Sequence, residues 1–238
     1  MKNYYSVDEL VDNPTQRVPI CLCLDVSGSM RGDPIRELNK GIKVFFDALK
    51  QDEIALYAAD VCIVTYGNRG ENSVQCISDF SSIESKPLPP ELTAYGQTPM
   101  GEAVNTCLDL LEARKKEYQD KGIDYYQPWL VLMTDGKPYG DKDPKAVYNA
   151  QQRASKMVND GNGKLVVFPI GIGTEADMTV LAKFSPKCEP FKLNQYDFSD
   201  FFVWLSQSVS TMSQSYGSRV KLAPTNWSRD RREISLGE

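Results

Sequence analysis

Asp25-Val26-Ser27-Gly28-Ser29 directly follows the apolar run of residues 18–24 and precedes a strongly periodic helical pattern. The apolar run is nearly continuous, as expected for a central parallel strand that is covered on both faces. Where this strand ends, side chains at alternate positions can point at one centre, and here those are Asp25, Ser27 and Ser29. One carboxylate and two hydroxyls are hard oxygen donors, which favour Mg²⁺ or Mn²⁺ over zinc or copper.

Three donors are too few for an octahedral ion, and two later stretches supply more. Thr98 lies in Gly96-Gln97-Thr98-Pro99, at the predicted start of a helix, and Asp135 follows the apolar strand of residues 129–133. A strand-end carboxylate and a helix-opening hydroxyl are harder to explain by helix capping alone than a single D-x-S-x-S would be. We therefore predict one metal site, formed by Asp25, Ser27, Ser29, Thr98 and Asp135.

These five residues resemble the metal-ion-dependent adhesion site (MIDAS) of von Willebrand factor A (vWA) domains, whose pattern is D-x-S-x-S, a distant Thr, and a distant Asp after a hydrophobic strand. The resemblance covers residues 17–215. It implies a Rossmann-like sheet in which the strands that end at Asp25 and Asp135 are neighbours. The longer matching stretches look like the stand-alone bacterial vWA proteins of the tellurium-resistance (TerY-like) group; they are residues 18–34, 92–111, 129–138 and 201–204.

Strand and helix patterns alternate along the chain, which predicts an α/β fold with a doubly wound, mostly parallel sheet and helices on both faces. We expect six strands, with residues 74–80 as one antiparallel edge strand; the others are residues 18–24, 61–66, 129–133, 165–170 and 189–193. Helices are predicted from Asp33-Pro34 to about Lys50, from Pro99 to residue 121, from Asp143-Pro144 to the Gly-Asn-Gly of 161–163, from Thr174, and over 198–212.

The length of 238 residues suits one domain with short extensions. We predict an N-terminal extension at residues 1–16, the vWA domain at 17–216 and a C-terminal tail at 217–238. The tail is mildly basic, and its Trp227 is exposed unless the tail docks on a surface. The sequence leaves open whether that surface belongs to this domain or to a neighbour.

Composition excludes several classes of protein. The net charge of −5 comes without a basic block, which argues against nucleic acid or an anionic membrane as a partner. The N-terminus has no signal-peptide pattern and no apolar run approaches the ~20 residues of a membrane span, so we predict a cytoplasmic protein. The chain has no histidine and no C-x-x-C pair, so we predict that its six cysteines are reduced and hold no zinc.

The resulting hypothesis is a non-enzymatic, Mg²⁺-dependent protein-binding module in a bacterial stress response of the tellurium-resistance type. The family resemblance implies that the ion keeps one position for an Asp or Glu carboxylate of a partner protein. One alternative is a regulatory or scaffold subunit that acts through its tail. Another is a Mg²⁺-dependent phosphatase of the haloacid-dehalogenase kind, but those enzymes have D-x-D where this chain has Ser27. The oligomeric state is not predicted.

Overall fold

The computed structural model describes residues 13–67, 73–160, 164–193, 197–215, 219–225, 227 and 234–237. Most of the predicted N-terminal extension (1–16) lies outside these residues, as do the Gly-Asn-Gly at 161–163 and parts of the predicted tail.

A six-stranded sheet forms the centre of the molecule, in the order β3-β2-β1-β4-β5-β6. Neighbouring strands run parallel except for β3, which is antiparallel to β2 at one edge, so the predicted fold class is confirmed. The strands are β1 (Val18–Asp25), β2 (Ala59–Tyr66), β3 (Val74–Ser78), β4 (Trp129–Thr134), β5 (Val166–Ile172) and β6 (Phe191–Leu193). β1 is buried along its whole length, which explains its continuous hydrophobicity.

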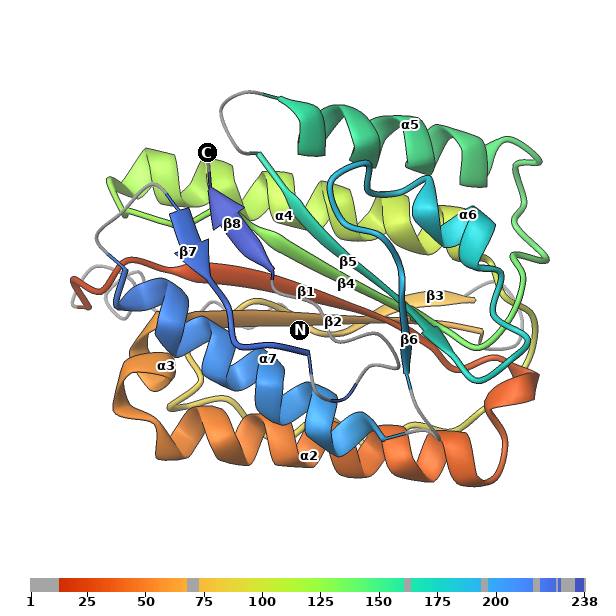
Figure 1. The fold of residues 1–238 in the computed structure, drawn as a ribbon, viewed down its shortest axis with the longest axis horizontal. Coiled ribbons are helices and arrows are strands. Elements are labelled where there is room, and N and C mark those ends of the chain that lie inside the picture. The colour runs from red at the N-terminus through yellow and green to blue at the C-terminus, as the bar shows by residue number, and fades with distance from the viewer. Residues whose placement is uncertain are drawn as a thin grey trace, which may run out of the picture.

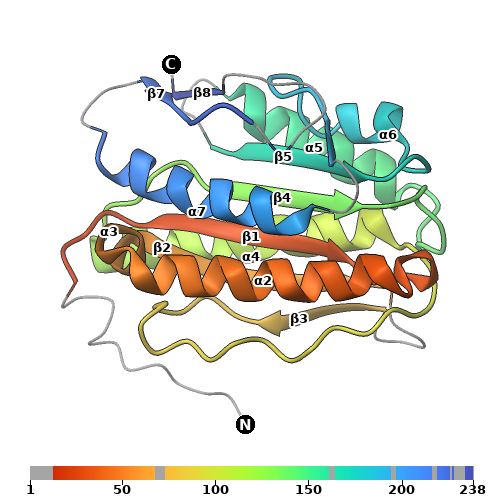
Figure 2. The same cartoon turned by 60° about the horizontal axis from the view of Figure 1, so that its bottom comes forward.

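Helices cover both faces of this sheet (Figures 1 and 2). One face carries α2 (Asp33–Gln51), α3 (Glu53–Ala58) and α7 (Phe198–Ser213), and the other carries α4 (Met100–Lys121), α5 (Ala146–Asn159) and α6 (Met178–Ala182). Strand alternation divides the core accordingly: Leu22 packs on the α2 and α7 side, and Cys21 and Cys23 pack on the α4 side. No helix in the described part of the chain is long and apolar enough to cross a membrane.

Several predicted element ends are wrong by a few residues. α5 begins at Ala146 and not at Asp143-Pro144, because the Asp143 carboxylate accepts the Lys145 N–H at 2.9 Å and closes a turn there. The helix expected from Thr174 begins at Met178, where Asp177 caps its first turn. Predicted strand ends also shift: β3 stops at Ser78, β5 extends to Ile172, and β6 begins only at Phe191. A 3-10 turn, η1 (Gly28–Met30), and the short α3 were not predicted.

The described part of the C-terminal tail packs on its own domain. It contributes a small antiparallel pair, β7 (Arg219–Lys221) and β8 (Ser235–Gly237), which lies beside α7 in Figure 1. Trp227 is only 2% exposed, and its ring contacts Phe191, Phe201 and Trp204. The indole N–H of Trp204 donates to the Ala223 carbonyl at 2.8 Å. This contact answers the question of where the tail docks, while the boundary at residue 216 stays a prediction.

Candidate metal centre

The candidate site lies where the strand order reverses. β1 pairs with β2 on one side and with β4 on the other, and Leu24 lies opposite Met133. Asp25 is the last residue of β1 and Asp135 follows the last residue of β4, so both carboxylates emerge at the carboxyl edge of the sheet. This edge, at a reversal of strand order, is the usual ligand site of open α/β sheets. The adjacency that the resemblance implied is confirmed.

Four of the five predicted side chains share one hydrogen-bond network. The fully buried Asp25 accepts the Ser27 backbone N–H on Oδ1 at 2.8 Å, which fixes the first turn of the loop. Ser29 Oγ donates to Asp135 Oδ1 at 2.8 Å and lies 3.0 Å from Ser27 Oγ. Residues from two strands, far apart in sequence, thus place their oxygen atoms together.

Backbone bonds bring the loop of Thr98 to the same place. The Tyr95 N–H donates to the Val26 carbonyl at 2.7 Å, and the Gly28 N–H donates to the Gly96 carbonyl at 3.1 Å. Thr98 itself exchanges two backbone hydrogen bonds with Tyr139, at 2.8 and 2.9 Å, and is buried. The helix that follows is α4, so Thr98 lies just before a helix start, as predicted.

Thr134 is a residue of this network to which the sequence reasoning gave no role. Its hydroxyl donates to Asp25 Oδ2 at 2.7 Å and accepts the Gly136 N–H at 3.2 Å. It therefore orients the Asp25 carboxylate from the neighbouring strand and holds the turn of Asp135. The available signal was its position immediately before Asp135, combined with the β1–β4 adjacency that the resemblance implied.

Gly67, just after β2, allows close packing against the loop that carries Ser27. Its φ of 127° is one that residues with side chains rarely adopt, and a Cβ there would lie 2.5 Å from the Ser27 backbone nitrogen. The loop after β1 thus passes directly over the end of β2, where the Val26 N–H donates to the Tyr66 carbonyl at 2.8 Å.

The carboxylates of Asp25 and Asp135 are buried without a cationic partner among the described residues. Burial raises the pKa of Asp25 to about 6, against the opposing effect of its hydrogen bonds from Ser27 and Thr134, and the nearby Asp135 adds to the rise. Burial also raises the pKa of Asp135, against the Ser29 hydrogen bond. Within the described residues, no lysine or arginine forms an ion pair with either aspartate. A bound cation would supply the missing charge.

The donors at the site suit a hard divalent ion. They are carboxylate and hydroxyl oxygens, which Mg²⁺ and Mn²⁺ prefer, and neither thiol nor imidazole belongs to the five residues. The residues present therefore fit the predicted ion. Ser29 is exposed while Asp25 and Ser27 are buried, so the site meets solvent on the Ser29 side.

Comparison with known proteins supports the fold. The von Willebrand factor type A domain model matches residues 20–210. No curated protein sequence matches this chain. Among solved structures, a von Willebrand factor type A protein from Catenulispora acidiphila aligns with a TM-score of 0.59 and 16% identity, covering 83% of this chain and 43% of that one.

Two further structures are similar in the same way. The pilus adhesin SpaC from Lactobacillus rhamnosus GG aligns with a TM-score of 0.63 and 14% identity, covering 83% of this chain and 31% of the adhesin. Proximal thread matrix protein 1 from the mussel byssus aligns with a TM-score of 0.52 and 19% identity, covering 84% of this chain and 47% of that protein. This chain spans less than half the length of each of these three relatives. Because the family model covers most of the sequence, the chain belongs to the von Willebrand factor type A domain family.

Proposed function

We propose that this protein is a non-enzymatic binding module that uses Mg²⁺ or Mn²⁺, held by Asp25, Ser27, Ser29, Thr98 and Asp135, to bind an Asp or Glu carboxylate of a partner protein. The observation that carries the proposal is a pair of buried carboxylates, linked through Ser27 and Ser29, that form no ion pair with a lysine or arginine in the described part of the chain. vWA domains commonly mediate protein–protein contacts, which is consistent with this role.

Charge explains why an anionic partner group would bind. Two carboxylates at most neutralise a divalent ion, and the three hydroxyl donors add no further negative charge. An ion in that setting still attracts one more anionic oxygen. Ser29 is the exposed member of the set, so a partner carboxylate would approach from its side.

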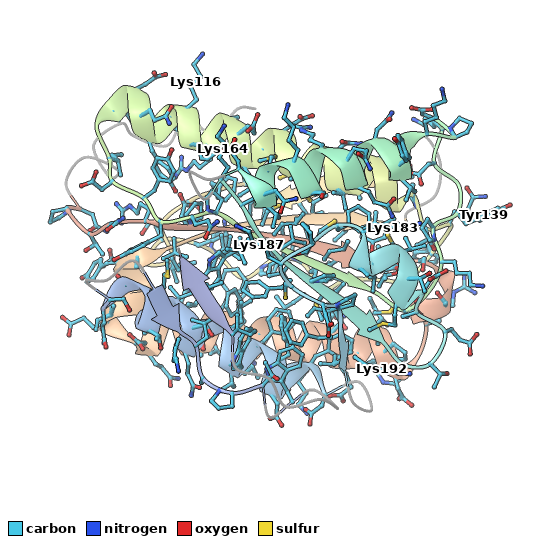
Figure 3. All side chains as sticks on the ribbon, turned by 45° about the horizontal axis from the view of Figure 1, so that its top comes forward. Lys116, Tyr139, Lys164, Lys183, Lys187 and Lys192 are labelled. Carbon is cyan, nitrogen blue, oxygen red and sulfur yellow. The ribbon has the colours of Figure 1, made fainter. Side chains whose placement is uncertain are left out.

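Aromatic side chains flank this approach. Tyr139, whose backbone pairs with Thr98, is 68% exposed and projects from the molecule in Figure 3. Tyr95 is 42% exposed, and the Arg31 guanidinium lies over its ring at 5.7 Å from the centroid. Tyrosine and arginine are enriched among the residues that contribute most to protein–protein binding. We assign Tyr95 and Tyr139 to the rim of the partner surface.

The phosphatase alternative lacks its reactive groups. Ser27 stands where such enzymes carry a second aspartate as acid and base, and the chain contains no histidine. We therefore propose no hydrolytic activity. A general phosphatase substrate should not turn over, and turnover that is lost in Asp25→Asn would contradict this part of the proposal.

We place the module in the cytoplasm, in a stress-response system of the tellurium-resistance type. This rests on the resemblance of residues 18–34, 92–111 and 129–138 to the TerY-like group.

The test is capture of partners from a host lysate by the immobilised full chain, in Mg²⁺ and in EDTA. We expect a partner that is retained only with the ion. Thr98→Ala should then weaken its binding about thirtyfold, equivalent to ~2 kcal/mol, because an anchor at the centre of the interface loses one neutral donor. The matched control is Thr93→Ala, an exposed threonine of the same segment, which should bind as the wild type does.

A partner that binds equally well in EDTA and to Thr98→Ala and Asp135→Ala would overturn the proposal. In that case the metal is at most structural, and the alternative of a subunit that acts through residues 217–238 gains support.

A further inference from the structure

Five of the six cysteines gather on the α4 side of the sheet. Cys21, Cys23, Cys62 and Cys107 belong to the core cluster of that side. Cys76 of β3 lies opposite Val64, which belongs to the same cluster, and its Sγ is 3.7 Å from Cys62 Sγ. All five are free thiols. This group is separate from the candidate metal centre and plays no part in the function proposed above.

An irregularity in the β2–β3 ladder turns a carboxylate toward two of these thiols. Regular alternation would put Cys76 and Asp79, three residues apart, on opposite faces. The register shifts between Ile63 and Val64, so that Ser78 and not Ile77 lies opposite Ile63. One extra residue restores the same face for Cys76 and Asp79. The Asp79 carboxylate then lies near both thiols.

The ligand atoms of Cys62, Cys76 and Asp79 all lie within 4.8 Å of one another. The two sulfur atoms, at 3.7 Å, already match the edge of a tetrahedron with metal–sulfur bonds of ~2.3 Å, which is about 3.8 Å long. Cys76 and Asp79 are exposed and Cys62 is buried, so an ion can reach the site from solvent while one ligand is held by the core.

Lys86 supplies a buried positive charge next to this group. It is 2% exposed, and its ammonium donates to the Val61 carbonyl at 2.5 Å, to Ser81 Oγ at 3.1 Å and to the Asp79 carbonyl. No carboxylate in the described part of the chain forms an ion pair with it. Burial lowers the pKa of Lys86, while the charges of Asp60, Cys62 and Asp79 oppose the change.

The charges balance when a divalent ion occupies the group. Two thiolates and one carboxylate together with a divalent ion leave one net negative charge. The Lys86 ammonium carries one positive charge, which balances it. Hydrogen bonds with neighbouring thiols, together with burial, raise the pKa of Cys62 and of Cys76, so an ion must displace a proton from each thiol when it binds. From this geometry we propose that Cys62, Cys76 and Asp79 form a second metal site for a thiophilic divalent ion of the Zn²⁺ or Cd²⁺ class, with one position open to solvent.

Such an ion would join the edge strand β3 to β2. β3 is held to the sheet on one side only, and its register is irregular where the three ligands converge. Metal bonds would therefore stabilise the pairing of β2 and β3 at the place where its hydrogen-bond ladder is irregular. Binding would displace protons from both thiols, so affinity should rise with pH.

The test uses the reduced, metal-free full chain and titrates it with Cd²⁺, with the ultraviolet thiolate-to-cadmium absorption as readout. That signal arises from sulfur ligands only and is blind to an ion at the oxygen-donor site. We expect the wild type to show it at one ion per chain. Cys76→Ser and Asp79→Asn should each weaken the affinity for Cd²⁺ more than about tenfold. Loss of a residue that only hydrogen-bonds to a metal ligand already costs about tenfold or more, and these two changes alter the ligands themselves. Both residues are exposed, so these changes leave the core intact.

Cys188→Ser is the matched control, because Cys188 is a partly exposed cysteine outside this cluster. It should bind Cd²⁺ as the wild type does. In a second measurement, Zn²⁺ should protect Cys76 but not Cys188 from alkylation under reducing conditions. Absence of the cadmium signal in the wild type, an unchanged affinity in Cys76→Ser, or protection of Cys76 only after oxidation would overturn the proposal. The last result would assign Cys62 and Cys76 to a dithiol–disulfide pair.

Discussion

At the scale of single residues, Asp25 makes the metal-free protein sensitive to pH. Its native pKa of about 6 lies above the ordinary value of about 4, so the native state holds this proton more tightly than the unfolded chain does. The contribution of this group to stability is therefore fully present below about pH 4 and is lost as the pH rises through about 6. The loss amounts to at most about 3 kcal/mol.

We expect Asp25→Asn to remove this loss. In EDTA at neutral pH, the variant should be more stable than the wild type, because a neutral amide avoids burying an unpaired charge. Mg²⁺ should stabilise the wild type through binding to the native state and should leave the variant unchanged. Denaturant unfolding at about pH 4.5 and pH 7.5, with and without Mg²⁺, measures both effects. A variant that retains the full Mg²⁺ response would show that the ion binds elsewhere. Asp47→Asn, an exposed position on α2, serves as the control.

At the scale of elements, Asp52 joins three helices. It lies between α2 and α3, accepts the Ile54 and Ala55 N–H groups at 3.0 Å, and accepts the Ser210 hydroxyl of α7 at 2.5 Å. Burial alone would raise the pKa of Asp52, but these hydrogen bonds outweigh it and lower the pKa. The stability from this carboxylate is therefore present above about pH 4 and is lost as the pH falls through the native pKa.

Asp52→Ala should destabilise the protein by about 1–2 kcal/mol at neutral pH and by less in acid, the opposite pH trend to that of Asp25. A double-mutant cycle with Ser210→Ala, followed by denaturant unfolding, separates the bond to α7 from the capping of α3. The comparison is Asp177→Ala, which removes a similar cap from α6, because the described hydrogen bonds of the Asp177 side chain go to Thr179 and Val180 of the same helix. Additive effects of Asp52→Ala and Ser210→Ala would contradict a coupling between α3 and α7.

At the scale of the whole molecule, the C-terminal segment completes the core on the α7 side. Trp227 packs on Phe201 with ring centroids 4.8 Å apart, and Val220, Leu222 and Leu236 are buried with it. Removal of residues 217–238 would expose this apolar surface. A truncated protein used to test binding through the tail would therefore be compromised in folding, and point changes on exposed residues are the better probe.

We expect Trp227→Ala to lower the free energy of unfolding by about 3–5 kcal/mol, as large aromatic truncations in a core do. Trp227→Phe should lose less, because the apolar volume is largely kept and Trp227 Nε1 has no hydrogen-bond partner among the described residues. Tyr148→Ala, at an exposed position on α5, should change little. Thermal unfolding of the three variants tests this. Equal stability of Trp227→Ala and the wild type would mean that the segment contributes nothing to the folded core.

Features that depend on short stretches of sequence could be predicted before the structure was known. The apolar run that ends at Asp25 predicted a central strand, because a strand covered on both faces needs no polar alternation. The D-x-S-x-S loop, Thr98 and Asp135 could be proposed as one site from residue chemistry and the family resemblance. The predicted start of α5 was wrong, because Asp143 closes a turn on Lys145 and does not cap the helix.

Contacts between residues that are distant in sequence could not be predicted in this way and are known only from the folded chain. The Thr134 hydroxyl donates to Asp25 because β1 and β4 pair. Arg114 lies in a charged stretch of α4, yet it is buried and its Nε donates to Asp60 Oδ2 at 2.7 Å. Cys62 and Cys76 lack the close spacing of a metal motif, and a register shift, which no local pattern encodes, brings them to Asp79. Trp227 packs on a surface that β6 and α7 form together. Side-chain periodicity fixes which face a residue takes on its own element, whereas pairing, register and docking depend on the packing of the whole chain.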